Sequence, residues 1–254
     1  MEQFDNLIEI LHKLRAPGGC PWDAEQTHQS IKPSLLEEAY EALEAIEAED
    51  DKALKEELGD ILLQVLFHAE IANERKAFSI EDVINHVADK LIRRHPHVFA
   101  EAKVKETKDV LHQWSKIKSG EGRKSVLDGV PKQLPALQQA QRLSEKAARV
   151  GFDWESIEHI WSKFDEEIAE LKEVVSSNNV RRLEDELGDV LTVIVNLARK
   201  LNIDAESALR RSSERFKKRF NYIEESLSNS GRDIHNATLD EMENLWSKAK
   251  IALS

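Results

Sequence analysis

The sequence has few cysteine, glycine, proline and aromatic residues. Of its 254 residues, one is cysteine, nine are glycine, six are proline and 6% are aromatic. The single cysteine, Cys20, excludes a disulfide framework and fits a reducing compartment, so we expect a cytoplasmic protein. Because glycine and proline interrupt helices, their scarcity beside abundant Ala, Leu, Glu and Lys predicts an all-α fold.

Long apolar runs and an excess of positive charge are also missing. No apolar run approaches the roughly 20 residues that a membrane-spanning helix needs. The first residues, MEQFDNLIEIL, are acidic and amphipathic, unlike a secretory signal peptide. The net charge of −12 argues against a protein whose main task is to bind the nucleic-acid backbone. We therefore expect neither a membrane nor a nucleic acid as a partner.

One arrangement of acidic residues is present twice. Residues 37–60 and 166–189 both have the form E-E-x-x-E, fifteen residues, E-L-G-D. A repeat of this length predicts two tandem domains, residues 1–119 and 136–254, joined by a linker at 120–135 that is rich in Gly, Pro and charge. An offset of 129 residues relates Glu38 to Glu167, Glu41 to Glu170, Glu57 to Glu186, and Asp60 to Asp189.

The spacing within each copy predicts that four carboxylates lie together. Glu38 and Glu41 are three residues apart and share a helix face, as do Glu57 and Asp60. Residues that favour turns separate the two pairs, so each copy is expected to form an antiparallel helical hairpin. Two carboxylates about 5 Å apart repel by roughly 3 kcal/mol at an effective dielectric constant near 20. A hard cation, Mg²⁺ or alternatively Mn²⁺, would relieve this repulsion.

A solvated acidic helix face is the alternative interpretation, because acidic residues are abundant in this chain. The apolar residues that follow Glu57 and surround Asp189 favour the metal site, since they place the carboxylates beside a buried stripe. Gly59 and Gly188 lie inside helical patterns, at a cost near 1 kcal/mol each relative to Ala. Close approach of a ligand or of a neighbouring helix would explain them.

Local signals mark a loop and several helix starts. The segment APGGCPWD, residues 16–23, is predicted to be a loop, and its Trp22 is interpreted as a hydrophobic plug, with a base-stacking wall as the alternative. Capping residues are expected before three helices: Ser79 with Asp82, Thr238 with Glu241, and Asp204.

Basic and aromatic residues repeat as well. Each half has two cations four residues apart and a Trp-x-x-x-Lys pair, the set that would bind a polyphosphate beside a metal. Solvated faces that form salt bridges are the alternative. The residues are Lys90, Arg94, Trp114 and Lys118 in the first half, and Arg215, Arg219, Trp246 and Lys250 in the second.

The second half has two further cations beside its acidic pairs. Lys163 and Arg182 stand where the first half has Ser34 and Ala53, and both are candidates for binding substrate. We therefore expect the second half to hold the main catalytic site. The first half would be a weaker or structural site.

Several motifs together point to a known family: the EExxE…ELGD hairpins, the segments GCPWD and KLIRRHPHVFA, and the Trp-x-x-x-Lys endings. They resemble the MazG family of nucleoside triphosphate pyrophosphohydrolases in its two-repeat form. The resemblance covers nearly the whole chain. The resemblance implies an all-α fold, Mg²⁺ dependence, a homodimer and hydrolysis of canonical and non-canonical nucleoside triphosphates to monophosphate and pyrophosphate. It also implies a role in clearing the nucleotide pool.

The resemblance assigns roles residue by residue. Arg215, Arg219 and Lys250 would bind the phosphates, with Lys163 as a further candidate, and Trp246 would line the nucleotide site. Glu166 would be the carboxylate next to the metal ligands and a further residue at the substrate. Metal ligands, which are also the catalytic residues, would be Glu167, Glu170, Glu186 and Asp189, and their first-half counterparts would be Glu38, Glu41, Glu57 and Asp60. Lys90, Arg94, Trp114 and Lys118 would form a second phosphate site.

Two other functions fit parts of the sequence. A non-enzymatic helical module that senses nucleotides or binds proteins predicts no Mg²⁺-dependent release of phosphate from any nucleotide. A carboxylate-bridged di-iron bundle needs Glu-x-x-His pairs, whereas these hairpins carry Glu-x-x-Glu and Glu-x-x-Asp.

Overall fold

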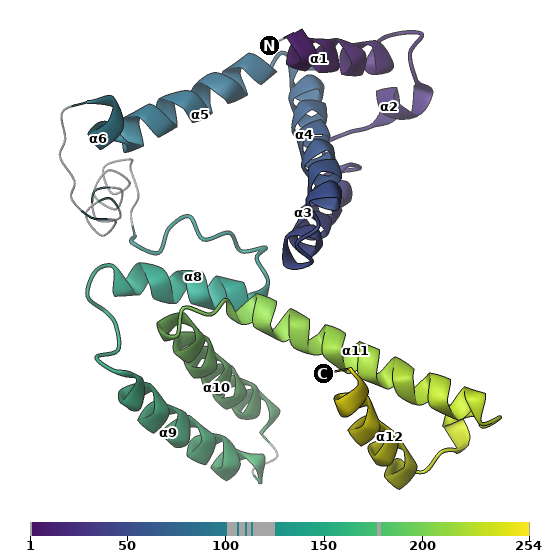
Figure 1. Ribbon diagram of the computed structural model, residues 1–254. Coiled ribbons are helices and arrows are strands. Elements are labelled where there is room, and N and C mark those ends of the chain that lie inside the picture. The colour runs from purple at the N-terminus through teal and green to yellow at the C-terminus, as the bar shows by residue number, and fades with distance from the viewer. Residues whose placement is uncertain are drawn as a thin grey trace. The chain divides into compact units, whose positions relative to one another are not determined.

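The computed structural model describes residues 2–100, 106, 110, 113, 125–176 and 179–253. All regular elements in these ranges are helices, which confirms the all-α prediction (Figure 1). The chain divides into two compact units, residues 1–110 and 111–254. None of the helices in the described ranges has both the length and the hydrophobicity needed to cross a membrane. The exact domain limits at 119 and 136 stay predictions.

The first unit is built on a hairpin of two long helices, α3 (Lys32–Glu47) and α4 (Asp51–Glu74), which pack along each other. The side chain of Asp50 accepts hydrogen bonds from the backbone N–H groups of Lys52 and Ala53, and so caps α4 directly after the turn. Helix α1 (Glu2–Arg15) packs against α4 and against the short α2 (Pro21–Glu25), while α5 (Ile80–Arg94) contacts α4 and α6 (Pro96–Phe99).

The core of the first unit lies between α1 and the second half of α4. The carboxylates of the hairpin stand on α3 and on the first half of α4, and therefore outside this core. The buried residues of the core are Leu11, Ile31, Leu66, Phe67, Ala69, Ile71 and Ile80.

The segment between α1 and α3 differs from the loop that the sequence predicts. Helix α2 starts at Pro21 because proline at the first helical position has a suitable φ and lacks only an N–H that would be unpaired there. Trp22 is 64% exposed, so its interpretation as a plug is wrong in this chain. The buried Arg15 holds the segment instead, by donating to the backbone carbonyls of Asp23 and Gln26.

A tight turn through Gly19 joins α1 to α2. The N–H of Gly19 donates to the carbonyl of Ala16 and that of Cys20 to the carbonyl of Leu14, both at 2.8 Å. This turn brings the chain so close to the end of α1 that a Cβ on residue 19 would lie 2.3 Å from the carbonyl oxygen of Lys13.

Replacing Gly19 by Ala should lower the free energy of unfolding of the first unit by about 2 kcal/mol, because a backbone oxygen in a helix end cannot move aside without strain. Urea denaturation of the full chain measures the effect. Gly59→Ala is the matched control: a Cβ there meets nothing within 4 Å, so the change should raise the free energy of unfolding by up to about 1 kcal/mol, because alanine favours the helix. An unchanged denaturation midpoint for Gly19→Ala would contradict the prediction.

The second unit repeats the hairpin with α9 (Ile157–Val175) and α10 (Val180–Lys200). Helix α8 (Ala136–Ala148) packs against α10 and against α11 (Ala205–Asn229). After the short 3₁₀ helix Ile234–Asn236, the last helix, α12 (Leu239–Ala252), packs against α11. The predicted capping residues are confirmed before α5, α11 and α12.

Gln141 fixes the start of α11. Its side chain is buried, donates to the carbonyl of Ile203 (3.3 Å) and accepts from the N–H of Ala205 (3.0 Å). Both partners lie at the connection between α10 and α11. One side chain of α8 therefore ties α8 to the start of α11. Helix α11 extends from this point away from the hairpin (Figure 1).

Asp153 ties the segment before α9 to the end of α10. Its carboxylate accepts hydrogen bonds from Arg199 and from Lys200, the latter at 2.9 Å. Burial acts to raise the pKa of this carboxyl, but the hydrogen bonds from Arg199 and Lys200 outweigh it and lower the pKa to about 2.

The Asp153 ion pairs should stabilise the second unit in a pH-dependent way. The folded pKa lies below the unfolded one, so the contribution is complete above about pH 4 and is lost as the pH falls toward 2. We expect Asp153→Asn to cost about 1 kcal/mol at pH 7, because solvent screens the partly exposed pair, and less at pH 3. Urea denaturation at both pH values measures this, with exposed Asp165→Asn as the control. Equal losses at pH 7 and pH 3 would refute the linkage.

Candidate functional site

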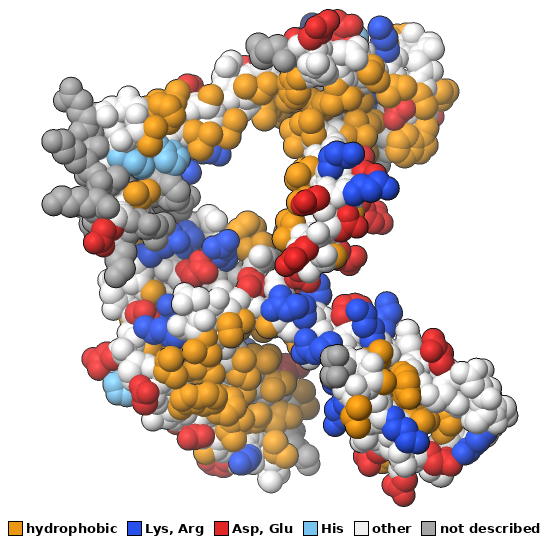
Figure 2. All heavy atoms as spheres, viewed as in Figure 1, with side chains coloured by type: hydrophobic (Ala, Val, Ile, Leu, Met, Phe, Trp, Pro, Cys, Tyr) orange, Lys and Arg blue, Asp and Glu red, His pale blue; other side chains and the backbone are white. Residues whose placement is uncertain are grey.

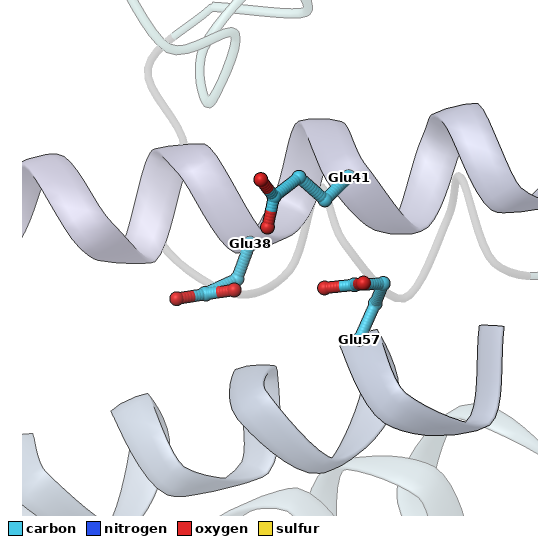
Figure 3. Close-up of side chains that lie close together, drawn as sticks. All are labelled: Glu38, Glu41 and Glu57. Atoms are coloured by element: carbon cyan, nitrogen blue, oxygen red, sulfur yellow. The ribbon is translucent and has the colours of Figure 1, made fainter. Parts of the chain in front are cut away.

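The first hairpin gathers carboxylates from both of its helices. Glu38 and Glu41 extend from α3 and Glu57 from α4, and their side chains converge in the space between the helices (Figure 3). One oxygen atom from each can be chosen so that all three lie within 4.8 Å of one another. Asp60, the fourth predicted member, stands outside this group of three.

The pKa values of the first cluster reflect its crowding. Burial raises the pKa of Glu38, and the charges of Asp60, Glu41 and Glu57 raise it further. Burial, Glu41 and Asp60 likewise raise the pKa of Glu57. Asp60 is thus close enough to act on both. A set of hard carboxylate oxygens that repel one another fits a divalent cation such as Mg²⁺ or Mn²⁺.

The second hairpin forms the corresponding cluster. Oxygen atoms of Glu167 on α9 and of Glu186 and Asp189 on α10 lie within 4.8 Å of one another. Glu167 is only 5% exposed, which is rare for a glutamate unless it is paired. Glu170 lies outside the group of three, although burial and the charges of Glu167 and Glu186 raise its pKa. The same oxygen chemistry fits a divalent cation here.

Two cations accompany the second cluster. The Lys163 ammonium lies 2.7 Å from Glu166 and 2.8 Å from Glu167, and its hydrogen bonds to these two carboxylates raise its pKa, so it is charged at neutral pH. The Nε atom of Arg182 lies 3.8 Å from Glu186. The structure therefore places both residues beside the acidic pairs, as their spacing predicts.

Comparison with known proteins identifies the repeated hairpins. Residues 26–99 and 155–223 both match the MazG nucleotide pyrophosphohydrolase domain. The chain belongs to the MazG family. Each matched stretch contains one complete acidic repeat, so the two clusters occupy equivalent places in two MazG domains.

Several curated proteins are similar to this MazG chain over nearly its whole length. It is 47% identical over 250 residues to the nucleoside triphosphate pyrophosphohydrolase/pyrophosphatase MazG of Thermotoga maritima, covering 97% of this chain and 95% of the relative. It is 41% identical over 259 residues to the nucleoside triphosphate pyrophosphohydrolase of Escherichia coli K12, covering 98% of each. The uncharacterised protein YabN of Bacillus subtilis is 46% identical over 98% of this chain, which spans 52% of YabN.

The repeated cations of the two MazG domains stand on helices outside the hairpins that carry the carboxylates. Arg215 and Arg219 stand on α11, which contacts α8, α10 and α12 but, within the described residues, not α9. Helix α11 leaves the end of α10 and extends away from the hairpin (Figure 1). Lys90 and Arg94 similarly stand on α5, which in the described part of the first unit does not contact α3. Trp114 and Lys118 lie outside the described residues.

Aromatic residues join the cations of the second unit. The Arg219 guanidinium lies over the ring of Trp246, 5.7 Å from its centroid. Phe216 packs against the same ring, with centroids 5.2 Å apart, and stacks with Phe220 at 6.0 Å. Lys250 is exposed on α12. Phe216 is not among the site residues that the sequence predicts. It lies four residues before Phe220, directly after Arg215, and this spacing already indicates that the two rings share a helix face.

The hairpin of the second unit leaves an apolar surface open. Figure 2 shows hydrophobic side chains gathered over α9 and α10. Leu187, Leu191 and Ile194 on α10 and Trp161 on α9 are each between 43% and 49% exposed. A Cβ added to Gly188 would meet nothing within 4 Å in the described structure, and the same is true of Gly59. Explaining these glycines by a neighbouring helix of the same chain is therefore wrong.

Proposed function

We propose that the protein hydrolyses nucleoside triphosphates to nucleoside monophosphate and pyrophosphate in the cytoplasm, with Mg²⁺ as its cofactor and Mn²⁺ as the alternative. The observation that carries this proposal is the pair of oxygen-only acidic clusters, each formed between the two helices of a MazG hairpin. The relatives named as nucleoside triphosphate pyrophosphohydrolases support it. Removal of non-canonical nucleotides from the cellular pool is the role we infer.

The second cluster is proposed as the main catalytic site. Glu167, Glu186 and Asp189 would hold the cation, and Glu170 stands beside them. When bound, the cation supplies positive charge to the polyphosphate and lowers the pKa of water. In the overall reaction, the water oxygen bonds to the α-phosphorus, and the bond between that phosphorus and the oxygen bridging to the β-phosphorus breaks, releasing pyrophosphate.

The basic and aromatic residues bind the rest of the nucleotide. Arg215, Arg219 and Lys250 would neutralise the charge that develops on the departing pyrophosphate, with Lys163 and Arg182 closer to the carboxylates. The Trp246 ring offers a face for the base, and Glu166 orients Lys163 through their 2.7 Å contact. The first domain has Ser34 and Ala53 at the positions of Lys163 and Arg182, and is therefore proposed as a weaker or structural site.

We also propose that the protein acts as a homodimer. The apolar surface of α9 and α10 is left exposed by the described residues of the chain, and exposed patches of this kind mark association surfaces. Helices α9 and α11 do not contact each other within the described part of one chain. A second copy seated on the hairpin would cover the apolar surface, and its α11 would bring the arginines to the carboxylates.

Incubation with a panel of canonical and non-canonical nucleotides, with and without Mg²⁺, tests the proposed activity. Resolving pyrophosphate from orthophosphate is the decisive measurement. We expect equimolar monophosphate and pyrophosphate when Mg²⁺ is present, and neither product when it is absent. Release of orthophosphate, or no release from any nucleotide, would contradict the proposal, and the second result would favour the non-enzymatic module.

A further inference from the structure

Of the two cations that accompany only the second cluster, Lys163 makes the closer contacts, at 2.7 and 2.8 Å against 3.8 Å for Arg182. In the second cluster, Lys163 lies three and four residues before Glu166 and Glu167 on α9 and contacts both. The equivalent residue of the first cluster is Ser34, three and four residues before Glu37 and Glu38 on α3. The carboxylates repeat at the same spacing in both halves, so Lys163 adds, in direct contact with a carboxylate, a positive charge that has no counterpart in the first cluster.

The position of Lys163 conflicts with a cation at Glu167. Its ammonium lies 2.8 Å from an oxygen of Glu167, whose side chain is only 7% exposed. Because this carboxylate is buried, few of its oxygen lone pairs remain open to a second cation once the ammonium contacts it. A divalent ion bound by Glu167, Glu186 and Asp189 would stand close to the ammonium and be repelled by it.

We propose that Lys163 is an internal counter-ion of the second cluster, which a divalent cation must displace from Glu167 in order to bind. This inference rests on the proposed function, in which both clusters hold a divalent cation. The second cluster then binds the ion more weakly than the first in the absence of nucleotide. Because lysine has a flexible four-carbon stem, the displaced ammonium can turn to a phosphate. Metal and nucleotide therefore promote each other's binding at this site, by the same factor in both directions.

Titration of the full-length protein with Mn²⁺, without nucleotide, tests this by measuring free Mn²⁺ with electron paramagnetic resonance. Glu57→Gln disables the first cluster in the background chain, so that the signal reports on the second. We expect Lys163→Gln to tighten Mn²⁺ binding about tenfold or more, because it removes a positive charge within a few ångström of the ion. Lys172→Gln, an exposed lysine of the same helix, removes the same charge and should leave the affinity unchanged.

The reciprocal exchange uses the first cluster. In a background with Glu186→Gln, Ser34→Lys places an ammonium at the equivalent position of α3. We expect Mn²⁺ binding to the first cluster to weaken by about tenfold. Circular dichroism of every variant checks that the helices are retained.

The outcomes separate this inference from the proposed function. If the parent binds Mn²⁺ and hydrolyses nucleotides but Lys163→Gln leaves the Mn²⁺ affinity unchanged or weaker, the counter-ion role is refuted and the activity stands. If neither cluster binds Mn²⁺ with or without a nucleoside triphosphate, the metal-dependent function fails, and the role of Lys163 fails with it.

Discussion

Replacing Glu186 by Gln should lower the rate of pyrophosphate release by at least about 100-fold, the size of effect seen when one electrostatic group is removed from a catalytic site. The substitution keeps the size of the side chain but removes one negative charge from the second cluster, which weakens its hold on the cation. Glu186 lies on α10 outside the buried core, and its ion pair with Arg182 is a loose 3.8 Å contact. We therefore expect unchanged helix content and a similar denaturation midpoint.

Glu184→Gln is the matched control, because Glu184 is an exposed glutamate of the same helix outside the cluster. It should leave pyrophosphate release near the parent rate. Glu57→Gln makes the same change in the first domain, where we expect a smaller loss. If Glu57→Gln abolished activity while Glu186→Gln left it intact, the assignment of the main site to the second domain would be wrong.

Arg219→Met should lose activity to a similar extent, and a mixed dimer should regain it. We propose that each active site combines the carboxylates of one copy with the α11 cations of the other. A dimer of one Glu186→Gln chain and one Arg219→Met chain then has one site with both defects and one site with none. We expect it to show about half the activity of the parent dimer, since two-fold symmetry gives two equivalent sites.

The mixed dimer can be made by co-expressing the two chains with different affinity tags and purifying on both tags in turn. Pyrophosphate release is measured against each parental variant dimer. If the cations acted within their own chain, each chain of the mixed dimer would carry one damaged site. No recovery would then be seen, and the shared-site proposal would be refuted while the role of Arg219 remained.

The parts of the fold that sequence predicted are those set by local spacing. Capping residues such as Asp204 fix where helices begin, because their side chains bond the nearest free N–H groups. The repeat between residues 37 and 60 placed Glu38, Glu41 and Glu57 together because two helices joined by a short turn must run side by side. Local chemistry and the length of the repeat were sufficient for both.

The parts that sequence missed depend on contacts between distant segments. The general tendency of aromatic rings to pack predicts a plug at Trp22, but Arg15 holds the segment by its backbone and leaves the ring exposed. The spacing of Arg215 and Arg219 showed that they share a helix face and gave no information on where that helix points. Asp60 and Glu170 each lie outside the group of three carboxylates in their hairpin. Which three of the four carboxylates come closest depends on how the two facing helices are offset along their axes.

The anchoring of α11 by Gln141 gives this helix the properties of a lever. Arg219 lies fourteen residues beyond Ala205, which corresponds to roughly 21 Å along the helix axis at 1.5 Å per residue. A tilt of about 5° at the pivot would therefore move the arginine by about 2 Å, and misplacement by only 1 Å at a reacting centre can reduce a rate about 100-fold. If Arg219 binds the pyrophosphate as proposed, the buried amide of Gln141 would thus help to set how accurately this distant guanidinium is positioned.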